Sequence, residues 1–147
     1  GKAMMRWVVD ELKPLIDREL PTLPERASTW IGGSSMGGLM SLYTITAHND
    51  VFSHAACLSP FLYPIRRDME NDCRRTLDPQ TKIYLSWGSS ETRSKRSLTW
   101  ISKTNLDMAN LLNAAHAQVY LNLVPGGTHC EACWEKEIPV FLDFFLR

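Results

Sequence analysis

The sequence predicts an α/β fold in which a mostly parallel sheet of about four strands is flanked by helices. Short apolar runs of strand length alternate along the chain with longer segments whose apolar residues recur at three- and four-residue spacing. Parallel strands need a crossover between them, and a helix is the usual crossover, so this alternation favours a parallel sheet. The chain of 147 residues has the length of a single domain with a substantial core.

The first half of the chain begins with an amphipathic pattern that ends at Pro21 and Pro24. Small and apolar residues after the first glycine cluster suit a buried helix, and Pro60 ends the second strand-like run. The predicted elements here are a helix from about Met4 to Glu19, a strand over 28–32, a helix from Met36 to about Ala47 and a strand over 54–59.

Turn residues mark the elements of the second half in the same way. Gly88-Ser89-Ser90 breaks one apolar run, and Pro125-Gly126-Gly127 closes the next. The last helix contains Pro139, which predicts a kink or a restart there. The predicted elements are a polar loop with a helix over 61–77, a strand over 82–87, a helix from about Leu98 to His116, a strand over 118–124 and a helix from Glu131 or Ala132 to Leu146.

Charge and hydropathy exclude two classes of partner. Sixteen basic residues balance sixteen acidic ones, and the arginine pairs at 66–67 and 74–75 lie among acidic residues, which is typical of solvated faces. We therefore expect no nucleic-acid partner. No apolar run has the length of a membrane span, and the amino terminus lacks the apolar core of a signal peptide, so we expect no membrane partner.

The four cysteines are Cys57, Cys73, Cys130 and Cys133. The Cys-x-x-Cys pair is compatible with redox chemistry or with half of a zinc site, but no second pair completes four zinc ligands. A thioredoxin-like pair would follow a strand near the start of a βαβ pattern. We therefore predict free, partly buried thiols, a reducing cytoplasmic setting, and no metal or organic cofactor.

Three residues that bear catalytic chemistry follow three of the predicted strands. Ser35 follows the first strand, Glu91 the third and His129 the fourth, and the carboxyl ends of parallel strands share one edge of the sheet. Ser35 lies at the centre of Gly33-Ser34-Ser35-Met36-Gly37, at the tip of a strand-to-helix turn. Gly33 and Gly37 are expected there because side chains would collide in so sharp a turn.

These residue types fit nucleophilic catalysis. A serine hydroxyl needs a base to take its proton, an imidazole titrates near neutrality, and a carboxylate behind it fixes its tautomer. The other histidines lie at helix ends or in a strand, and Asp107 falls inside a predicted helix, so His129 and Glu91 are favoured. The Met36 amide is one expected oxyanion donor. A second usually comes from a loop after an earlier strand, and no such strand is predicted before Met4.

The chain resembles the esterase branch of the α/β-hydrolase superfamily, which includes enterochelin esterases, S-formylglutathione hydrolase, feruloyl and acetylxylan esterases, and mycolyltransferases. The matching segments occur in order over essentially the whole chain. They are residues 11–17 (Glu-Leu-Lys-Pro-Leu-Ile-Asp), 33–38 (Gly-Ser-Ser-Met-Gly-Gly), 58–60 (Leu-Ser-Pro), 84–88 (Tyr-Leu-Ser-Trp-Gly) with Glu91, 127–129 (Gly-Thr-His) with Trp134, and 138–145. The resemblance implies that Ser35 is the nucleophile, Glu91 the acid and His129 the base.

The resemblance also implies a truncated α/β-hydrolase fold, either the C-terminal half of the family fold or a minimal form. Family members carry about four more strands before the segment that matches residues 11–17, and they more often have Asn at the position of Cys130. Without those strands the edge of the 28–32 strand is exposed, so we expect a homo-oligomer in which a partner chain covers that edge.

The combined expectation is a serine esterase that cleaves short acyl or aryl carboxylic esters through a Ser-His-Glu triad and an acyl-enzyme. Trp87 and Trp134, together with Phe61 and Tyr63, are predicted to line an aromatic acyl pocket, although aromatic residues near strand ends also occur in cores. Two alternatives stay open: a non-catalytic truncated hydrolase domain that serves as an interaction module, and acyl transfer to an alcohol by the same residues.

Overall fold

The computed structural model describes residues 1–62, 71 and 77–147. The predicted loop with a helix over 61–77 lies mostly outside these residues, as do Tyr63, Cys73 and the arginine pairs at 66–67 and 74–75.

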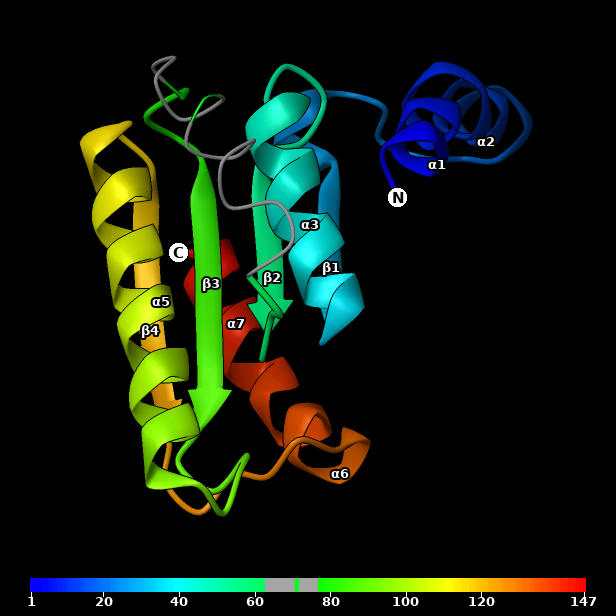
Figure 1. Ribbon diagram of the computed structural model, residues 1–147. Coiled ribbons are helices and arrows are strands. Elements are labelled where there is room, and N and C mark those ends of the chain that lie inside the picture. Colours follow the sequence, from blue (N-terminus) through cyan, green and yellow to red (C-terminus); the bar gives the residue numbers. More distant parts are fainter. Residues whose placement is uncertain (63–70, 72–76) are drawn as a thin grey trace.

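Four parallel strands form the sheet in the order β1-β2-β3-β4. They are β1 (Trp30–Ser34), β2 (His54–Leu58), β3 (Lys82–Gly88) and β4 (Gln118–Val124). Their carboxyl ends point toward the end of the molecule where α6 lies (Figure 1). This arrangement confirms the predicted α/β fold class.

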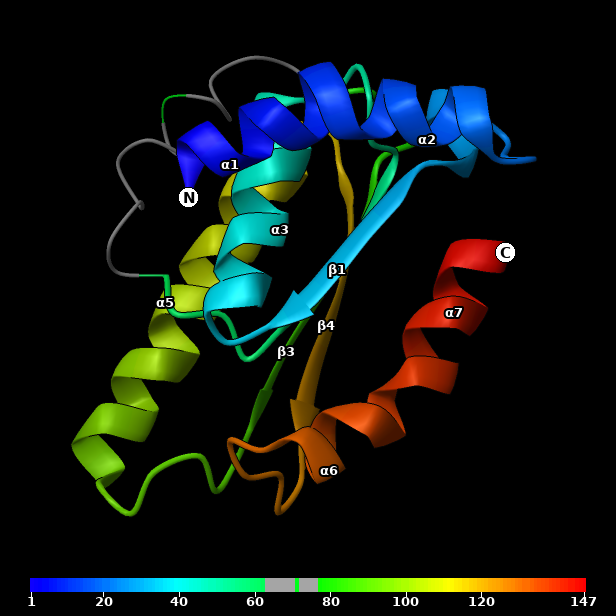
Figure 2. The same cartoon turned by 90° about the vertical axis from the view of Figure 1, so that its right-hand side faces the viewer.

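Helices cover both faces of the sheet. α3 and α5 pack on one face and α7 packs on the other (Figures 1 and 2). The helical segments are α1 (Lys2–Trp7), the π-helical η1 (Val8–Leu12), α2 (Lys13–Glu19), the short 3₁₀ turn η2 (Arg26–Ser28), α3 (Met36–Ala47), α5 (Lys95–Ala114), α6 (Glu131–Trp134), the 3₁₀ turn η4 (Glu135–Glu137) and α7 (Ile138–Leu146). Within the described part of the chain, no helix combines the length and the apolar character that crossing a membrane requires.

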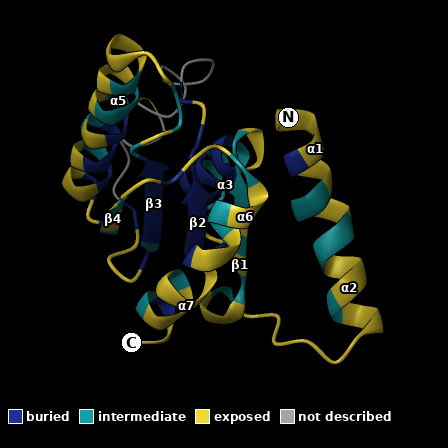
Figure 3. Ribbon diagram, turned by 90° about the horizontal axis from the view of Figure 1, so that it is seen from below, coloured by how far each residue is buried: buried dark blue, intermediate teal, exposed yellow. Residues whose placement is uncertain are grey.

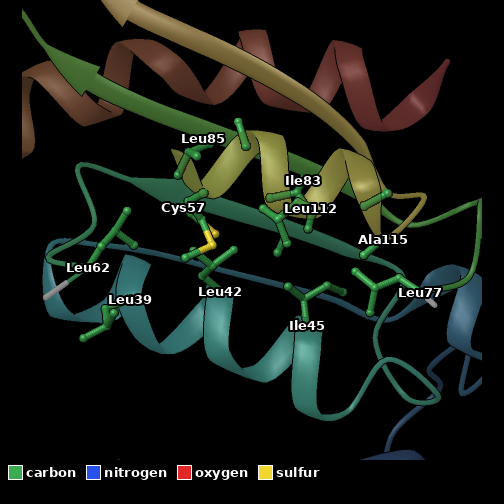
Figure 4. Close-up of a cluster of buried hydrophobic side chains, with 14 of the residues drawn as sticks. Leu39, Leu42, Ile45, Cys57, Leu62, Leu77, Ile83, Leu85, Leu112 and Ala115 are labelled. Atoms are coloured by element: carbon green, nitrogen blue, oxygen red, sulfur yellow. The ribbon is translucent and has the colours of Figure 1, made fainter. Parts of the chain in front are cut away.

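Alternation along the strands divides the core between the two faces of the sheet. Ala55 and Cys57 of β2 point toward α3 and α5, whereas Ala56 and Leu58 point toward α7. The larger cluster, between the sheet and the α3–α5 layer, is shown in Figure 4; it includes Leu39, Leu42, Ile45, Ile83, Leu85, Met108 and Leu112. Parallel strands covered on both faces are expected to be apolar throughout, and every residue of β2 is buried.

A buried polar contact joins the α7 layer to the sheet. The Tyr84 hydroxyl donates to Glu137 Oε2 at 2.7 Å and accepts from Asn122 Nδ2 at 2.7 Å. Burial raises the pKa of the Tyr84 phenol, which therefore stays protonated and able to donate. The Tyr84 hydroxyl thus both donates and accepts, and it gives the buried Glu137 side chain a hydrogen-bond donor.

β1 and α5 begin at residues that differ from the predicted ones, because local turns and caps set where they begin. β1 begins two residues later than expected, because residues 26–28 form a 3₁₀ turn. α5 begins three residues earlier, because the Ser94 hydroxyl accepts from the Ser97 N–H at 3.2 Å and caps it. The last helix restarts at Ile138 with Pro139 in its first turn, as predicted.

Both outer strands of the sheet expose side chains, whereas β2 and β3 are almost wholly buried (Figure 3). On β1, Trp30 is 36% exposed, and on β4, Leu121 is 38% exposed. Among the described residues, β1 is paired on one side only, so its outer backbone groups are available to another strand. Self-association through this edge stays a prediction.

We expect the chain to self-associate through β1 at micromolar concentration. Light scattering should give a mass above 16.7 kDa, and Trp30→Lys should move the distribution toward the monomer, because a charged edge strand resists pairing. Leu121→Lys places the same charge on the opposite edge and should leave the mass unchanged. A monomeric wild-type chain would contradict the prediction.

The pH dependence of stability should depend on His54. Its ring stacks on Trp30 at 5.0 Å and contacts Phe145 at 5.0 Å, and burial lowers its pKa below the ordinary histidine value. The unfolded chain then binds a proton at His54 more readily than the folded chain does. The stability that His54 contributes is therefore fully present above about pH 6.5, the ordinary histidine pKa, and is lost as the pH drops through the lowered pKa. In chemical denaturation, His54→Phe should lose less stability than wild type between about pH 7 and about pH 5.

His116→Asn is the matched control, because this exposed histidine has a positive φ of 73° that asparagine tolerates. It should keep the pH dependence of the wild type. Equal slopes for His54→Phe and the wild type would show that His54 does not contribute.

Candidate active site

The common register of the strands sets three loops side by side. Ser34, Leu58, Ser86 and Asn122 are aligned across the sheet, so the chain leaves β1, β2 and β3 at neighbouring points. Ser35 follows β1 directly, and Glu91 lies three residues beyond the end of β3. His129 lies five residues beyond the end of β4.

The structure brings the three predicted catalytic side chains into one chain of contacts. His129 Nε2 lies 2.9 Å from Ser35 Oγ, and His129 Nδ1 lies 3.3 Å from Glu91 Oε2. The Glu91 side chain is 6% exposed, whereas that of His129 is 40% exposed. The carboxylate is thus enclosed behind the imidazole, and the imidazole and hydroxyl face the solvent side.

The backbone at Ser35 is strained in a way that projects its side chain. Its φ of 53° and ψ of −117° lie outside the regions that residues with a side chain ordinarily adopt. A Cβ at Gly33 would lie 2.7 Å from the Gly37 backbone, which explains this glycine. The expectation for Gly37 was wrong, because a Cβ there meets nothing within 4 Å. The second crowded position is Gly38, whose Cβ would lie 2.9 Å from the Leu58 carbonyl oxygen.

Hydrogen bonds between the turn after β3 and the turn after β4 hold Glu91 and His129 together. The Ser89 N–H donates to the Val124 carbonyl at 3.0 Å, and the Ser90 N–H donates to the Gly127 carbonyl at 2.9 Å. A Cβ at Gly88 would lie 2.1 Å from the Gly127 oxygen, so only glycine allows this approach. The Gly88 N–H in turn donates to Glu91 Oε1 at 2.8 Å.

Ser59, which lies in the 58–60 segment and had no predicted role, also contacts Glu91. It follows β2, is 5% exposed and has a φ of 45°. Its hydroxyl donates to Glu91 Oε1 and accepts from Trp134 Nε1 at 3.0 Å. The Trp134 ring also lies edge-on to the His129 ring, with 4.9 Å between centroids. Ser59 and Trp134 therefore connect the carboxylate to the face of the imidazole.

The Met36 amide lies at the start of α3, directly after Ser35. The first N–H groups of a helix have no partner within it, so they are available to an oxyanion. Met36 is 53% exposed. Its predicted oxyanion role stays a prediction.

In the part of the chain that the structure describes, one cavity is lined by the residues just before Ser35 and another by His129. The larger has a volume of about 430 Å³, and its lining includes Gly33, Ser34 and Trp134. The smaller, of about 290 Å³, is lined by Phe61, Glu91 and His129 among others. Trp87 lines neither cavity: it is 4% exposed, and its Nε1 donates to Ser102 Oγ at 3.0 Å beneath α5.

The cysteines that the structure describes are unpaired. Cys57 is buried in the core, and Cys130 and Cys133 are partly exposed beside His129. Across residues 1–62, 71 and 77–147, no three histidine, cysteine or acidic side chains gather closely enough to hold a metal ion.

The fold is similar to that of several solved structures. Enterochelin esterase from Shigella flexneri aligns with a TM-score of 0.74 and 21% identity, over 95% of this chain and 36% of that one. The BES protein from Bacillus cereus aligns with a TM-score of 0.77 and 15% identity, over 98% of this chain and 55% of that one. S-formylglutathione hydrolase from Staphylococcus aureus aligns with a TM-score of 0.70 and 17% identity, over 95% of this chain and 59% of that one.

The chain therefore spans between roughly a third and three fifths of the length of these structures. A search of curated proteins found no significant match. The family model described as "Putative esterase" matches residues 2–145, which is nearly the whole chain. This chain belongs to that esterase family and has an α/β fold.

Proposed function

We propose that the chain is a serine esterase that hydrolyses carboxylic esters through Ser35, His129 and Glu91. The observation that carries the proposal is the continuous contact from Ser35 Oγ to His129 Nε2 and from His129 Nδ1 to Glu91 Oε2. A nucleophile, a base and a group that orients the base are the minimum set for acyl transfer by serine. The chain's membership of an esterase family agrees with this chemistry.

In the acylation step, His129 Nε2 takes the Ser35 proton as Oγ attacks the ester carbonyl carbon. Glu91 accepts the hydrogen bond from His129 Nδ1 and stabilises the imidazolium that forms. The Met36 N–H donates to the oxygen on which negative charge develops. His129 then protonates the leaving alcohol, and the acyl group stays on Ser35.

Deacylation repeats the sequence with water in place of the serine hydroxyl. His129 takes a proton from the water, which attacks the acyl carbon, and Ser35 leaves with the proton returned by His129. The exposure of His129 gives water direct access to the imidazole. An alcohol that reached the same position would be acylated instead, so transfer and hydrolysis differ only in the acceptor.

The larger cavity supports an ester with an apolar acyl or aryl group as the substrate. Trp134, Ile138 and Phe141 supply apolar surface beside the Gly33–Ser34 backbone. Glu131 and Glu135 also line this cavity, and their charge disfavours a substrate with an anionic group there. Neutral esters such as p-nitrophenyl acetate and butyrate are therefore suitable probes.

Ser35→Ala should lower turnover of p-nitrophenyl acetate roughly a thousandfold or more and remove the initial burst of nitrophenol, because no acyl-enzyme can form. The neighbouring variant Ser34→Ala keeps Oγ of Ser35 and should retain the burst. Stopped-flow absorbance measures both, and wild-type turnover by Ser35→Ala would refute the assignment.

Ser59 is proposed as a positioning residue that acts through Glu91. Ser59→Gly removes the hydroxyl and relieves the backbone strain at a φ of 45°, so stability should hold or rise. We expect kcat to fall roughly tenfold with little change in KM, because the orienting carboxylate loses a donor. Trp134→Phe keeps an aromatic ring but removes the N–H to Ser59 together with part of the indole, so a loss should appear in kcat as well.

Thermal denaturation and steady-state kinetics of the same preparations separate the two roles of Ser59. A loss of stability that parallels the loss of activity would assign Ser59 a structural role only.

A further inference from the structure

Cys130 and Cys133 follow His129 closely in the chain, and both of their sulfurs lie near one hydroxyl group, that of Thr128. Thr128 Oγ1 is 3.3 Å from Cys130 Sγ and 3.3 Å from Cys133 Sγ. The Cys133 N–H donates to the Cys130 carbonyl at 3.1 Å, so one turn of chain separates the two residues. Both side chains therefore lie on the same side of this turn, which is the arrangement that a disulfide between residues three apart requires.

The surroundings of Cys133 favour its thiolate. The Thr128 hydroxyl and the Thr128 N–H, at 3.4 Å, both approach Cys133 Sγ. These hydrogen bonds lower the pKa of the Cys133 thiol, with a contribution from the Cys130 side chain and from the charge of Lys136. Cys57 is the opposite case, because complete burial raises its pKa and removes it from solvent. Reactive cysteines combine thiolate character with access, as Cys133 does.

We propose that Cys130 and Cys133 are a redox-active pair that closes to a disulfide on reaction with a low-molecular-weight disulfide, RSSR. The Cys133 thiolate attacks one sulfur of RSSR, forms a mixed disulfide and releases one thiolate. The Cys130 thiolate then attacks Cys133 Sγ, forms the intramolecular bond and releases the second thiolate. The two cysteine protons pass to the released thiolates, so RSSR becomes two RSH while the pair loses two electrons.

The pair is placed to control the base of the proposed reaction, and this part of the inference rests on the proposed function. Cys130 is the next residue in the chain after His129, and Cys133 directly precedes Trp134, whose ring contacts His129. Closure brings the two sulfurs, which are free thiols in this structure, to about 2.05 Å, so at least one of them must move. A displacement of the imidazole by a fraction of an ångström lengthens its contact with Ser35, and the oxidised chain should therefore react more slowly.

The test is to incubate the full chain with excess oxidised glutathione and to follow intact mass and ester hydrolysis on the same sample. We expect a mass loss of about 2 Da, a tryptic peptide with an internal Cys130–Cys133 disulfide, and p-nitrophenyl acetate turnover reduced roughly tenfold and restored by dithiothreitol. Cys133→Ser removes the attacking thiolate and should keep its activity in the oxidant, with no internal disulfide. Cys73→Ser removes a thiol outside the pair and should respond as the wild type does.

Each measurement has an outcome that overturns its part of the inference. Persistence of two free thiols at Cys130 and Cys133, or a stable glutathione adduct on either, would refute the redox pair. A closed disulfide with unchanged turnover would refute its control of His129. Absence of turnover from the reduced chain would contradict the proposed esterase function, and the mass measurement would still decide whether the pair closes.

Discussion

The common register of four parallel strands is the constraint on which the candidate site depends. It places the residues after β1, β2, β3 and β4 along one edge, so that Ser35 and Ser59 leave the sheet at adjacent points. Glu91 and His129 come from loops that would diverge without the close approach of Gly88 to Gly127. A few backbone hydrogen bonds between these two turns therefore determine whether the carboxylate meets the imidazole.

The hydrophobic core and the candidate site both depend on the central strands β2 and β3. β2 and β3 are buried on both faces, and the clusters on either side fix the positions of α3 and α7. α3 holds the strained backbone of Ser35 at its first turn. On the other face, Tyr84 and Glu137 hold the segment that carries Trp134 toward α7. Among the described residues, two of the three non-glycine residues with positive φ, Ser35 and Ser59, lie at the site, where rigid packing can maintain such strain.

Much of this arrangement could be predicted from the sequence, because local signals mark it. Ser35, Glu91 and His129 each stand beside glycine-rich turn residues that end a strand-like run. The α/β fold was predicted from short apolar runs that alternate with segments of helical apolar spacing. The restart of the last helix was predicted from Pro139. Boundaries that depend on single contacts, such as the Ser94 cap, were missed by a few residues.

Contacts between distant segments could not be read in the same way. Leu58-Ser59-Pro60 carries no pattern that points to a carboxylate 32 residues away, and the contact exists only because β2 and β3 are neighbours. Trp134 was predicted to bind substrate, and the direction of its indole N–H adds a contact with Ser59 that only the fold defines. Trp87 was grouped with it on residue type alone, and the alternation of β3 instead turns its ring toward α5.

The central claim is that Ser35 is activated by His129, and covalent labelling tests it most directly. A fluorophosphonate probe reacts with serines whose hydroxyl is activated by a base. After incubation with the full chain, peptide mapping by mass spectrometry should place one adduct on Ser35, and His129→Ala should remove it while the fold persists by circular dichroism. A folded wild-type chain that stays unlabelled, or an adduct on another serine that survives His129→Ala, would contradict the account.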